Sequence, residues 1–494
     1  MSPSAVLRDA EGTVHFMGVA GAGMVSLAEL LLRSGREVSG CDLEPSPAAR
    51  TLESLGATIL RGHDPSHLEG VGVLVVTAAV PSDHPEILRA REAGIPVLKR
   101  AEALGEWVSR GRVVGVSGTH GKTTTTAMAT DILEAGGLEP TGFVGGRVHG
   151  WESNLRFGGS DLFVVEADEY DRSFHHLHPR VAVVTSVEAD HLDVYGDVTA
   201  IEDAFVLFLR QVDPDGRVAV CGDDHGASRL LPGLGKRAYT YGLNPGAQLR
   251  GTELTMGPGE TTVRVVEEGV GRGRMTLRVP GRHNVRNALG AAAAARALGV
   301  GWKAVFDALR DFRGVGRRFQ VVGEANGVTV VDDYAHHPTE IRATLAAARA
   351  RYSGRRIVAV FQPHLYTRTR DFATEFGEAL AGADEVWVAG IYPAREEPIE
   401  GVSGVLVAQA VLDAGARHVY FHPELSDLSG KLAEALAPGD VCLTLGAGSI
   451  EHLPGDLLSA LRGRGDEVGA GAKRGGRKRS GGRDRPNGRK GAAS

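Results

Sequence analysis

The sequence has little cysteine, few aromatic residues and no long apolar run. Only three cysteines, Cys41, Cys221 and Cys442, occur in 494 residues, and they lie far apart without metal-ligand spacing, so we expect reduced thiols. Aromatic residues make up 5%, which argues against a stacking platform for single-stranded nucleic acid. The stretch Val14–Leu32 is interrupted by glycines and ionisable residues, so it predicts a strand-turn-helix and not a membrane span. With no signal peptide visible, we expect a cytoplasmic protein with no membrane insertion and no nucleic acid partner.

The charge is unevenly distributed. The segment Lys473–Lys490 carries nine basic residues and one acidic residue, which leaves −14 on the rest of the chain because the total is −6. An acidic body is not typical of a nucleic-acid enzyme. The basic end has almost no apolar residues that could offset its ordering entropy, so we expect a disordered tail.

Short β-branched runs alternate with Ala- and Leu-rich stretches of helical length along most of the chain. This rhythm predicts parallel sheets joined by crossover helices, and therefore an α/β fold. Alternating polar and apolar residues from 245 to 280 predict a small antiparallel section. We divide the chain into a Rossmann-like N-terminal domain, a central P-loop ATPase-like domain with a mixed sheet, a Rossmann-like C-terminal domain and the disordered tail, over residues 1–110, 111–316, 317–462 and 463–494, respectively.

The most informative segment leads from a buried strand, Val113–Val116, through a Gly-rich turn into a helix that opens with Lys122 and Thr123. Backbone N–H groups of such a turn surround a phosphate, and the positive end of the helix adds to the attraction. Lys122 would neutralise the β- and γ-phosphates of ATP, and the Thr123 hydroxyl would bind Mg²⁺. Val116 stands where the first glycine of the motif usually lies, so the loop is a shorter variant that begins at Gly118.

Acidic residues follow a predicted buried strand that ends at Val165, so they would emerge at the carboxyl edge of the sheet, where open α/β sheets bind ligands. Mg²⁺ prefers such oxygen ligands beside phosphate and water. The candidates are Glu166, which comes first, and its competitors Asp168, Glu169 and Asp171. His191 follows the next strand in an Asp-His-x-Asp context and is a further candidate for a metal ligand.

Two other patterns predict nucleotide binding. Asn284 and Asn287 lie three residues apart near the start of a predicted helix, so their amides share one face and suit an adenine edge. Asn284 could instead cap the helix. A Gly-rich turn after the strand Val14–Met17, with Asp42 at the end of the next strand, would place a helix N-terminus on a diphosphate. This turn by itself leaves open whether the diphosphate belongs to UDP or to NAD.

Several motifs in a fixed order make the chain similar to the Mur ligase family over roughly residues 13–460. Gly118–Thr125 resembles the phosphate loop of that family, and His120 resembles its alanine-adding branch. The other matching segments are, in chain order, Glu166–Asp171, Asp190–Asp193, Gly281–Asn287, Arg317–Gln320, Asp332–Glu340 and Gln362–Arg368. A carbamylated lysine used by some members has no counterpart, because the first lysine after His191 is Lys236, and Leu365 stands where the family often has arginine.

The resemblance implies a role for each matching position. The catalytic residues would be Lys122, Glu166, His191 and Arg318, with Thr123, Glu166 and His191 as Mg²⁺ ligands. The residues around ATP would be Gly118, Thr119, His120, Gly121, Lys122, Thr123, Thr124, His283, Asn284, Asn287, Arg318 and Asp333. Those around the UDP-sugar would be Gly18, Gly21, Gly23, Met24 and Asp42, and those around the amino acid would be Tyr334, His336, His364 and Arg368. Arg318 would swing from a hinge onto the γ-phosphate, and Arg368 would hold the carboxylate of the amino acid.

The activity that the resemblance implies is ATP-dependent ligation of L-alanine to the lactyl carboxylate of UDP-N-acetylmuramate, through an acyl phosphate, with release of ADP and phosphate. This would serve peptidoglycan synthesis. Three alternatives remain: a ligase that attaches a preformed tripeptide to the same sugar, an NAD(P)-dependent oxidoreductase built on the first Gly-rich turn, and a non-catalytic nucleotide-binding scaffold. We expect a monomer or a homodimer. Neither the general base nor the choice among alanine, glycine and serine follows from the residues.

Overall fold

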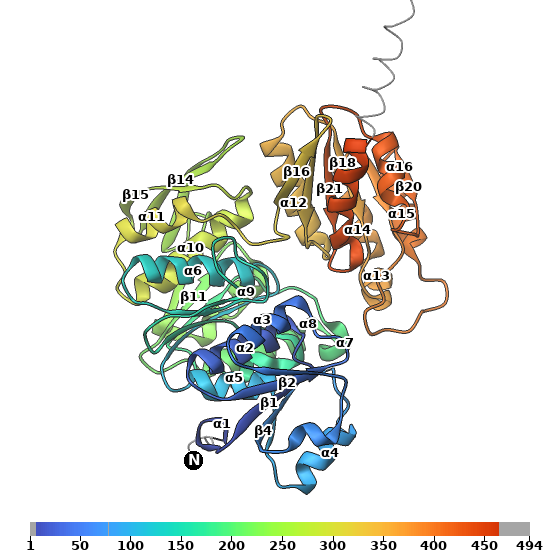
Figure 1. Cartoon of the computed structure of the whole chain (residues 1–494). Coiled ribbons are helices and arrows are strands. Elements are labelled where there is room, and N and C mark those ends of the chain that lie inside the picture. The colour runs from blue at the N-terminus through green and yellow to red at the C-terminus, as the bar shows by residue number, and fades with distance from the viewer. Residues whose placement is uncertain (1–5, 78, 464–494) are drawn as a thin grey trace, which may run out of the picture. The chain divides into compact units, whose positions relative to one another are not determined.

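The computed structural model describes residues 6–77 and 79–463, so the predicted tail lies outside the described residues beyond Gly463. Its strands form three separate sheets covered by helices (Figure 1), which confirms an α/β fold with three sheet-containing domains. The chain divides into two compact units: one comprises the chain up to Gln320 with Ala343–Ser353, and the other comprises Val321–Arg342 and the chain from Gly354. The domain boundaries that we placed near residues 110 and 316 stay predictions. Among the helices of the described residues, none combines the length and apolar character needed to span a membrane.

The first sheet has the strand order β3-β2-β1-β4-β5, and all its pairs are parallel. Its strands are β1 Thr13–Met17, β2 Val38–Asp42, β3 Thr58–Arg61, β4 Val71–Val76 and β5 Val97–Lys99. The helical elements around it are α1 Val6–Asp9, α2 Ala22–Arg33, α3 Pro47–Ser54, η1 Pro65–Leu68, α4 Pro85–Glu92 and α5 Arg100–Val108. The strand order reverses between β1 and β4, which is the switch point where ligands bind in doubly wound sheets.

The two faces of the first sheet differ because side chains alternate along each strand. Val14 and Phe16 of β1 belong to the hydrophobic core that includes α2, α3 and α5. His15 and Met17 point the other way, and Met17 packs with residues of β4 and α4 in a second, smaller cluster. Figure 1 shows α4 on the side of the sheet opposite to α2 and α5.

The middle sheet has ten strands in the order β15-β14-β13-β12-β11-β10-β6-β9-β7-β8. The strands are β6 Arg112–Ser117, β7 Thr141–Phe143, β8 Leu155–Arg156, β9 Leu162–Glu166, β10 Val181–Val184, β11 Arg217–Cys221, β12 Ala238–Gly242, β13 Leu249–Met256, β14 Thr261–Glu267 and β15 Val270–Leu277. Its helical elements are α6 Lys122–Ala135, η2 Tyr170–His176, α7 Leu192–Tyr195, α8 Val198–Arg210, α9 His225–Arg229, η3 Leu231–Gly233, η4 Gly235–Arg237, α10 Arg282–Ala297 and α11 Trp302–Asp311. β6 pairs in parallel with β9 and β10, whereas β14 pairs antiparallel with both β13 and β15. This confirms the mixed sheet. The buried alanines of α10 let this helix approach α6 closely.

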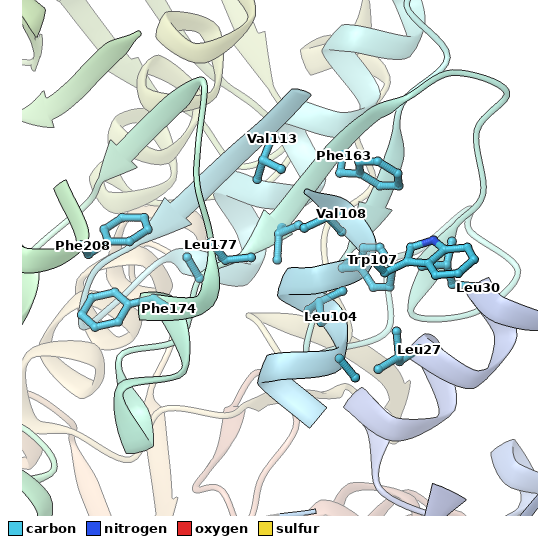
Figure 2. Close-up of a cluster of buried hydrophobic side chains, with 14 of the residues drawn as sticks. Leu27, Leu30, Leu104, Trp107, Val108, Val113, Phe163, Phe174, Leu177 and Phe208 are labelled. Atoms are coloured by element: carbon cyan, nitrogen blue, oxygen red, sulfur yellow. The ribbon is translucent and has the colours of Figure 1, made fainter. Parts of the chain in front are cut away.

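One hydrophobic core joins the first sheet to the middle sheet within the first unit. Figure 2 shows side chains of α2 and α5 in the same cluster as Val113 of β6 and Phe163 of β9. Trp107 of α5, which is 4% exposed, belongs to this cluster. Burial of an aromatic side chain contributes about 2 kcal/mol or more to the free energy of folding, so a core shared by both sheets explains why they form one compact unit.

The third sheet has the order β16-β17-β21-β18-β19-β20. Its strands are β16 Gln320–Ala325, β17 Val328–Asp333, β18 Ile357–Phe361, β19 Glu385–Val388, β20 Val419–Phe421 and β21 Val441–Leu445. The helical elements are α12 Pro338–Arg351, α13 Tyr366–Asp371, α14 Ala373–Leu380, α15 Gly404–Asp413, α16 Leu428–Ala435 and η5 Ser449–His452. The pairs of β17, β18 and β19 are parallel, so the ends of β17 and β18 meet at one edge.

Candidate active site

The loop Gly118–Gly121 connects β6 to α6 and presents the N-terminus of that helix. Gly121 is the N-cap residue, adopts a left-handed φ of 84° and gives α6 no side-chain cap, so the first N–H groups of the helix remain available to an anion. Lys122 Nζ donates to the carbonyl of Gly118 at 2.9 Å and to both carboxylate oxygens of Glu169 at 2.8 Å. The predicted strand, turn and helix are therefore present, and the ammonium group of Lys122 is paired with the carboxylate of Glu169.

The loop is held in place by residues at the end of β10. The N–H of Thr119 donates to the Ser186 carbonyl at 2.9 Å, and the N–H of His120 donates to Ser186 Oγ at 3.0 Å. Thr185 Oγ1 donates to the carbonyl of His120. Sequence reasoning missed Thr185 and Ser186, although polar residues at the end of a buried strand were a signal for this edge.

Thr123 and Glu166 form a pair of oxygen donors beside the loop. Thr123 Oγ1 donates to Glu166 Oε1 at 2.7 Å, and Glu166 Oε2 accepts the N–H of Gly145 at 2.6 Å. These two residues are close because β6 pairs with β9 in parallel, which brings the ends of both strands to the same edge of the sheet. A hydroxyl and a carboxylate oxygen at this separation fit the ligand preference of Mg²⁺.

Glu169 is more buried than Glu166 or Asp168, with 3% of its surface exposed. Burial lowers the pKa of Lys122, but the carboxylates of Glu169 and Asp168 outweigh this and raise its pKa overall, so the ammonium group stays charged. Burial also raises the pKa of the Glu169 carboxyl, against the opposing effect of Lys122. Asp168 lies 3.7 Å from Lys122 Nζ, and the side chain of Asp171 lies outside what the structure describes.

His191 lies in the same region, at the N-cap of α7, and its backbone adopts the left-handed conformation with a φ of 51°. Its Nε2 is 3.9 Å from Glu169 Oε1 and 3.9 Å from Asp190 Oδ2, and its ring lies edge-on to Tyr170. The structure therefore brings His191 next to Glu169, a neighbour that the sequence had ranked only as a competitor of Glu166.

The start of α10 lies against the loop. A Cβ atom added to Gly121 would come within 2.5 Å of Asn287 Oδ1, and Asn287 Nδ2 donates to Asn284 Oδ1 at 3.2 Å. Asn284 Nδ2 donates to the Pro280 carbonyl at 2.7 Å. The alternative role of Asn284 as helix cap is wrong, because the helix begins at Arg282 and Gly281 occupies the cap position. His283 precedes these amides in the first turn of α10.

Arg318 follows α11 and its N–H donates to the Val315 carbonyl at 3.2 Å. Its two neighbours, Arg317 and Phe319, have positive φ values of 57° and 50°. Non-glycine residues rarely adopt this conformation, and those that do are concentrated at active sites and ligand-binding segments. The backbone around Arg318 is thus held in an unusual conformation at the end of the first unit.

The Gly-rich turn of the first sheet runs from β1 into α2, with Gly21 as the N-cap. The N–H of Gly18 donates to the Cys41 carbonyl at 2.9 Å, and the N–H of Ala20 donates to Asp42 Oδ2 at 2.9 Å. Asp42 therefore stabilises the turn itself. Gly23 lies beside the Arg100 side chain, whose Nη1 would be 3.2 Å from an added Cβ. The side chain of Met24 is 2% exposed and part of the hydrophobic core, and its predicted contact with the sugar nucleotide stays a prediction.

Four predicted amino-acid-binding residues gather at the ends of β17 and β18 in the second unit. The rings of Tyr334 and His336 are 5.2 Å apart, and those of His336 and His364 are 6.0 Å apart. Arg368 Nη1 lies 3.4 Å from His364 Nδ1, and Arg368 is 6% exposed. Asp333, the predicted ATP contact, ends β17 and accepts the N–H of Ala335 at 2.9 Å. The four side chains that the sequence assigned to one ligand are thus neighbours in space.

The same chain matches known protein families in three consecutive segments. The models described as "Mur ligase family, catalytic domain", "Mur ligase middle domain" and "Mur ligase, glutamate ligase domain" match residues 13–112, 116–295 and 317–448, respectively. The chain is 46% identical over 438 residues to the UDP-N-acetylmuramate–L-alanine ligase of Salinibacter ruber, covering 88% of this chain and 92% of the relative. It is 44% identical over 457 residues to the protein of that name from Solidesulfovibrio magneticus, covering 92% of this chain and 100% of the relative.

A solved structure shows the same arrangement of elements. The UDP-N-acetylmuramate-alanine ligase of Thermotoga maritima matches with a TM-score of 0.77 and 30% identity, covering 92% of this chain and 100% of that one.

Proposed function

The chain belongs to the Mur ligase family, and from this premise we propose that it ligates L-alanine to the lactyl carboxylate of UDP-N-acetylmuramate, with cleavage of ATP to ADP and phosphate. The reaction is a step of peptidoglycan precursor synthesis. The observation that carries the proposal is the loop before α6, where Lys122 lies at the helix N-terminus and Thr123 is hydrogen-bonded to Glu166. Relatives named for this reaction, 44% and 46% identical over most of the chain, support the choice of substrates.

ATP is proposed to bind with its phosphates on the N-terminus of α6. Lys122 is already charged and already neutralised by Glu169, so the γ-phosphate would take the place of that carboxylate as its counter-charge. Asn284 and Asn287 lie beside the loop and would meet the adenine edge together with His283. Contacts of Arg318 and Asp333 with ATP stay predictions.

Mg²⁺ fits the oxygen donors present here. We propose that Thr123 and Glu166 hold one ion and that His191 holds a second. When bound, the ions would offset the negative charge that develops as the γ-phosphoryl group moves.

The reaction needs two steps because a carboxylate anion is a poor electrophile. A lactyl carboxylate oxygen attacks the γ-phosphorus, the bond between that phosphorus and the β–γ bridging oxygen breaks, and ADP leaves. The amine nitrogen of L-alanine then attacks the acyl carbon, the bond to phosphate breaks, and the nitrogen loses a proton as the amide forms. Holding the reactants in place supplies most of the acceleration in such transfers.

The two substrates are assigned to the first and third domains. The helix N-terminus after the Gly18 turn suits the diphosphate of the UDP-sugar, and buried Arg368 suits the carboxylate of the amino acid. His364 lies beside Arg368, the rings of His336 and Tyr334 follow next to it, and these three side chains would limit the size of the side chain accepted. A cytoplasmic location and the state of monomer or homodimer stay predictions.

Phosphate release with UDP-N-acetylmuramate and ATP tests the proposal when L-alanine, glycine, L-serine and a tripeptide are offered in turn. We expect turnover with L-alanine and, in Lys122→Ala, a loss of at least about 10³-fold, because a charge at the transferred phosphate is removed. Lys236→Ala is the control, since Lys236 is exposed and lies on η4. Turnover with the tripeptide alone would assign the chain to the tripeptide-attaching alternative, and full activity of Lys122→Ala would refute the site. Binding of NAD in preference to the UDP-sugar would favour the oxidoreductase alternative.

A further inference from the structure

Five polar side chains from separate segments converge on the α4 face of the first sheet. They are His15 of β1, Cys41 of β2, His63 after β3, His67 of η1 and Glu86 of α4. His15, Cys41 and Glu86 are 0% exposed, and the side chains of His63 and His67 are 16% and 14% exposed. A buried group of imidazole, thiol and carboxylate is unusual on a face that is otherwise apolar.

The distances in this group are those of ligands around one ion. The donor atoms of His15, Cys41, His67 and Glu86 all lie within 4.8 Å of one another. His15 Nε2 is 3.4 Å from Cys41 Sγ, and Cys41 Sγ is 3.7 Å from both Glu86 oxygens. His67 Nδ1 is 3.1 Å from Glu86 Oε1. Zinc bonds of 2.0–2.3 Å in a tetrahedron place neighbouring ligand atoms about 3.3–3.7 Å apart, so little movement is needed to admit an ion.

Surrounding contacts orient these donors. His15 Nδ1 bonds to Ser39 Oγ at 2.8 Å, which turns Nε2 toward Cys41. Glu86 Oε1 accepts the N–H of Asp64 at 2.8 Å. Metal-binding histidines and carboxylates typically have such a second partner, which fixes the tautomer and the direction of the lone pair.

Charge also favours a cation here. Among the described residues, the ion-pair partners of Glu86 are His63 and His67, and no lysine or arginine reaches it. A buried carboxylate beside a thiol is costly without a cation. Imidazole and thiolate donors select zinc and similar ions over Mg²⁺.

We propose that His15, Cys41, His67 and Glu86 form a structural Zn²⁺ site in the first domain, with His63 as an adjacent donor. Four protein ligands leave no open position, which is the arrangement of a structural site and not of a catalytic one. The ion would tie β1 and β2 to η1 and α4. Because the Cys41 carbonyl also accepts the N–H groups of Gly18 and Val19, at 2.9 and 3.1 Å, it would stiffen the turn at the end of β1 as well.

Zinc binding by the full chain tests the proposal directly. After chelator treatment and dialysis, the protein is titrated with Zn²⁺ against a chromophoric chelator in excess Mg²⁺. We expect one Zn²⁺ per chain that Mg²⁺ does not displace, and a rise in Tm on binding. With Co²⁺ as a probe, we expect a sulfur-to-cobalt charge-transfer band and the visible spectrum of a tetrahedral ion. Failure to bind Zn²⁺ with this stoichiometry would overturn the proposal.

Variants assign the ion to these residues. Cys41→Ser should abolish the charge-transfer band, whereas Cys221→Ser, a buried cysteine of β11, should leave it unchanged. His67→Asn removes a ligand at the rim, so the fold should survive, and zinc affinity should fall roughly tenfold or more. Circular dichroism checks that each variant is folded. A band that persists in Cys41→Ser, or zinc affinity unchanged in folded His67→Asn, would refute the assignment.

Discussion

Gly121→Ala tests the packing of the phosphate loop, because an alanine at this position would be destabilising both through its backbone conformation and through contact with a neighbouring side chain. Gly121 has a φ of 84°, a left-handed conformation that costs an alanine about 1–2 kcal/mol. Gly137, just beyond the other end of α6, has a φ of 76°, and an added Cβ meets nothing within 4 Å. Gly137→Ala is therefore a matched control that carries only the conformational cost.

The added cost at Gly121 comes from Asn287. A Cβ would lie 2.5 Å from Asn287 Oδ1, so this amide must withdraw by about 0.9 Å to reach the 3.4 Å of ordinary contact. A strained rotamer costs about 0.5–1.5 kcal/mol, and loss of the Asn287–Asn284 hydrogen bond costs about 1 kcal/mol. We expect Gly121→Ala to lower the free energy of unfolding by about 3 kcal/mol and Gly137→Ala by about 1.5 kcal/mol.

Urea unfolding followed by circular dichroism measures the difference, and the KM for ATP measures its consequence. Because the displaced amide is assigned to the adenine edge, the KM of Gly121→Ala should rise roughly tenfold or more, as about 1.4 kcal/mol of lost binding implies. Gly137→Ala should keep the KM of the parent protein. Equal losses of stability in the two variants, with no change in KM, would show that Asn287 does not meet the loop.

Three further predictions follow from single contacts. Arg368→Ala should raise the KM for L-alanine by roughly 10–100-fold, since a charge-assisted pair is lost, whereas exposed Arg370→Ala should not; equal KM values would refute the assignment. Glu166→Gln should raise the Mg²⁺ concentration that gives half-maximal ATP turnover, and an unchanged Mg²⁺ dependence would remove this residue from the metal site. Burial raises the pKa of Asp440, but the hydrogen bond and charge of Arg356 outweigh burial and lower this pKa in the folded protein. The Asp440 carboxylate therefore stabilises the protein above the unfolded pKa of about 3.9, and this stabilisation is lost as pH falls through the lower folded pKa. Asp440→Asn should therefore cost about 1 kcal/mol at pH 7, measured by urea unfolding, with the difference from the parent protein shrinking in acid; a constant difference would contradict the linkage.

The local pattern of the chain was enough to predict most elements. Apolar runs between polar turns predict buried parallel strands at Ile357–Phe361, Glu385–Val388 and Val441–Leu445, and β18, β19 and β21 have these bounds. The residues Asp371–Ala381 predict a single helix from their composition, and this prediction is wrong in detail, because Phe372 leaves helical geometry, with φ −118°, and separates α13 from α14. The strand β3 was missed because it is short and only partly buried, so its pattern is weak.

The sequence by itself was enough to predict where the phosphate loop lies along the chain. A strand, a Gly-rich turn and a helix that opens with Lys122 follow one another along the chain, so local physics is sufficient to predict a phosphate site. Three contacts were decided only by the tertiary structure. They are the ion pair of Glu169 with Lys122, the hydrogen bond of Thr185 to His120 in the loop, and the contact of His15 with Cys41. These pairs are separated by 47, 65 and 26 residues, and they meet because of strand order and register, which no local pattern encodes. The wide spacing of the cysteines, which had excluded a metal motif along the sequence, therefore says nothing about a metal site assembled across four elements.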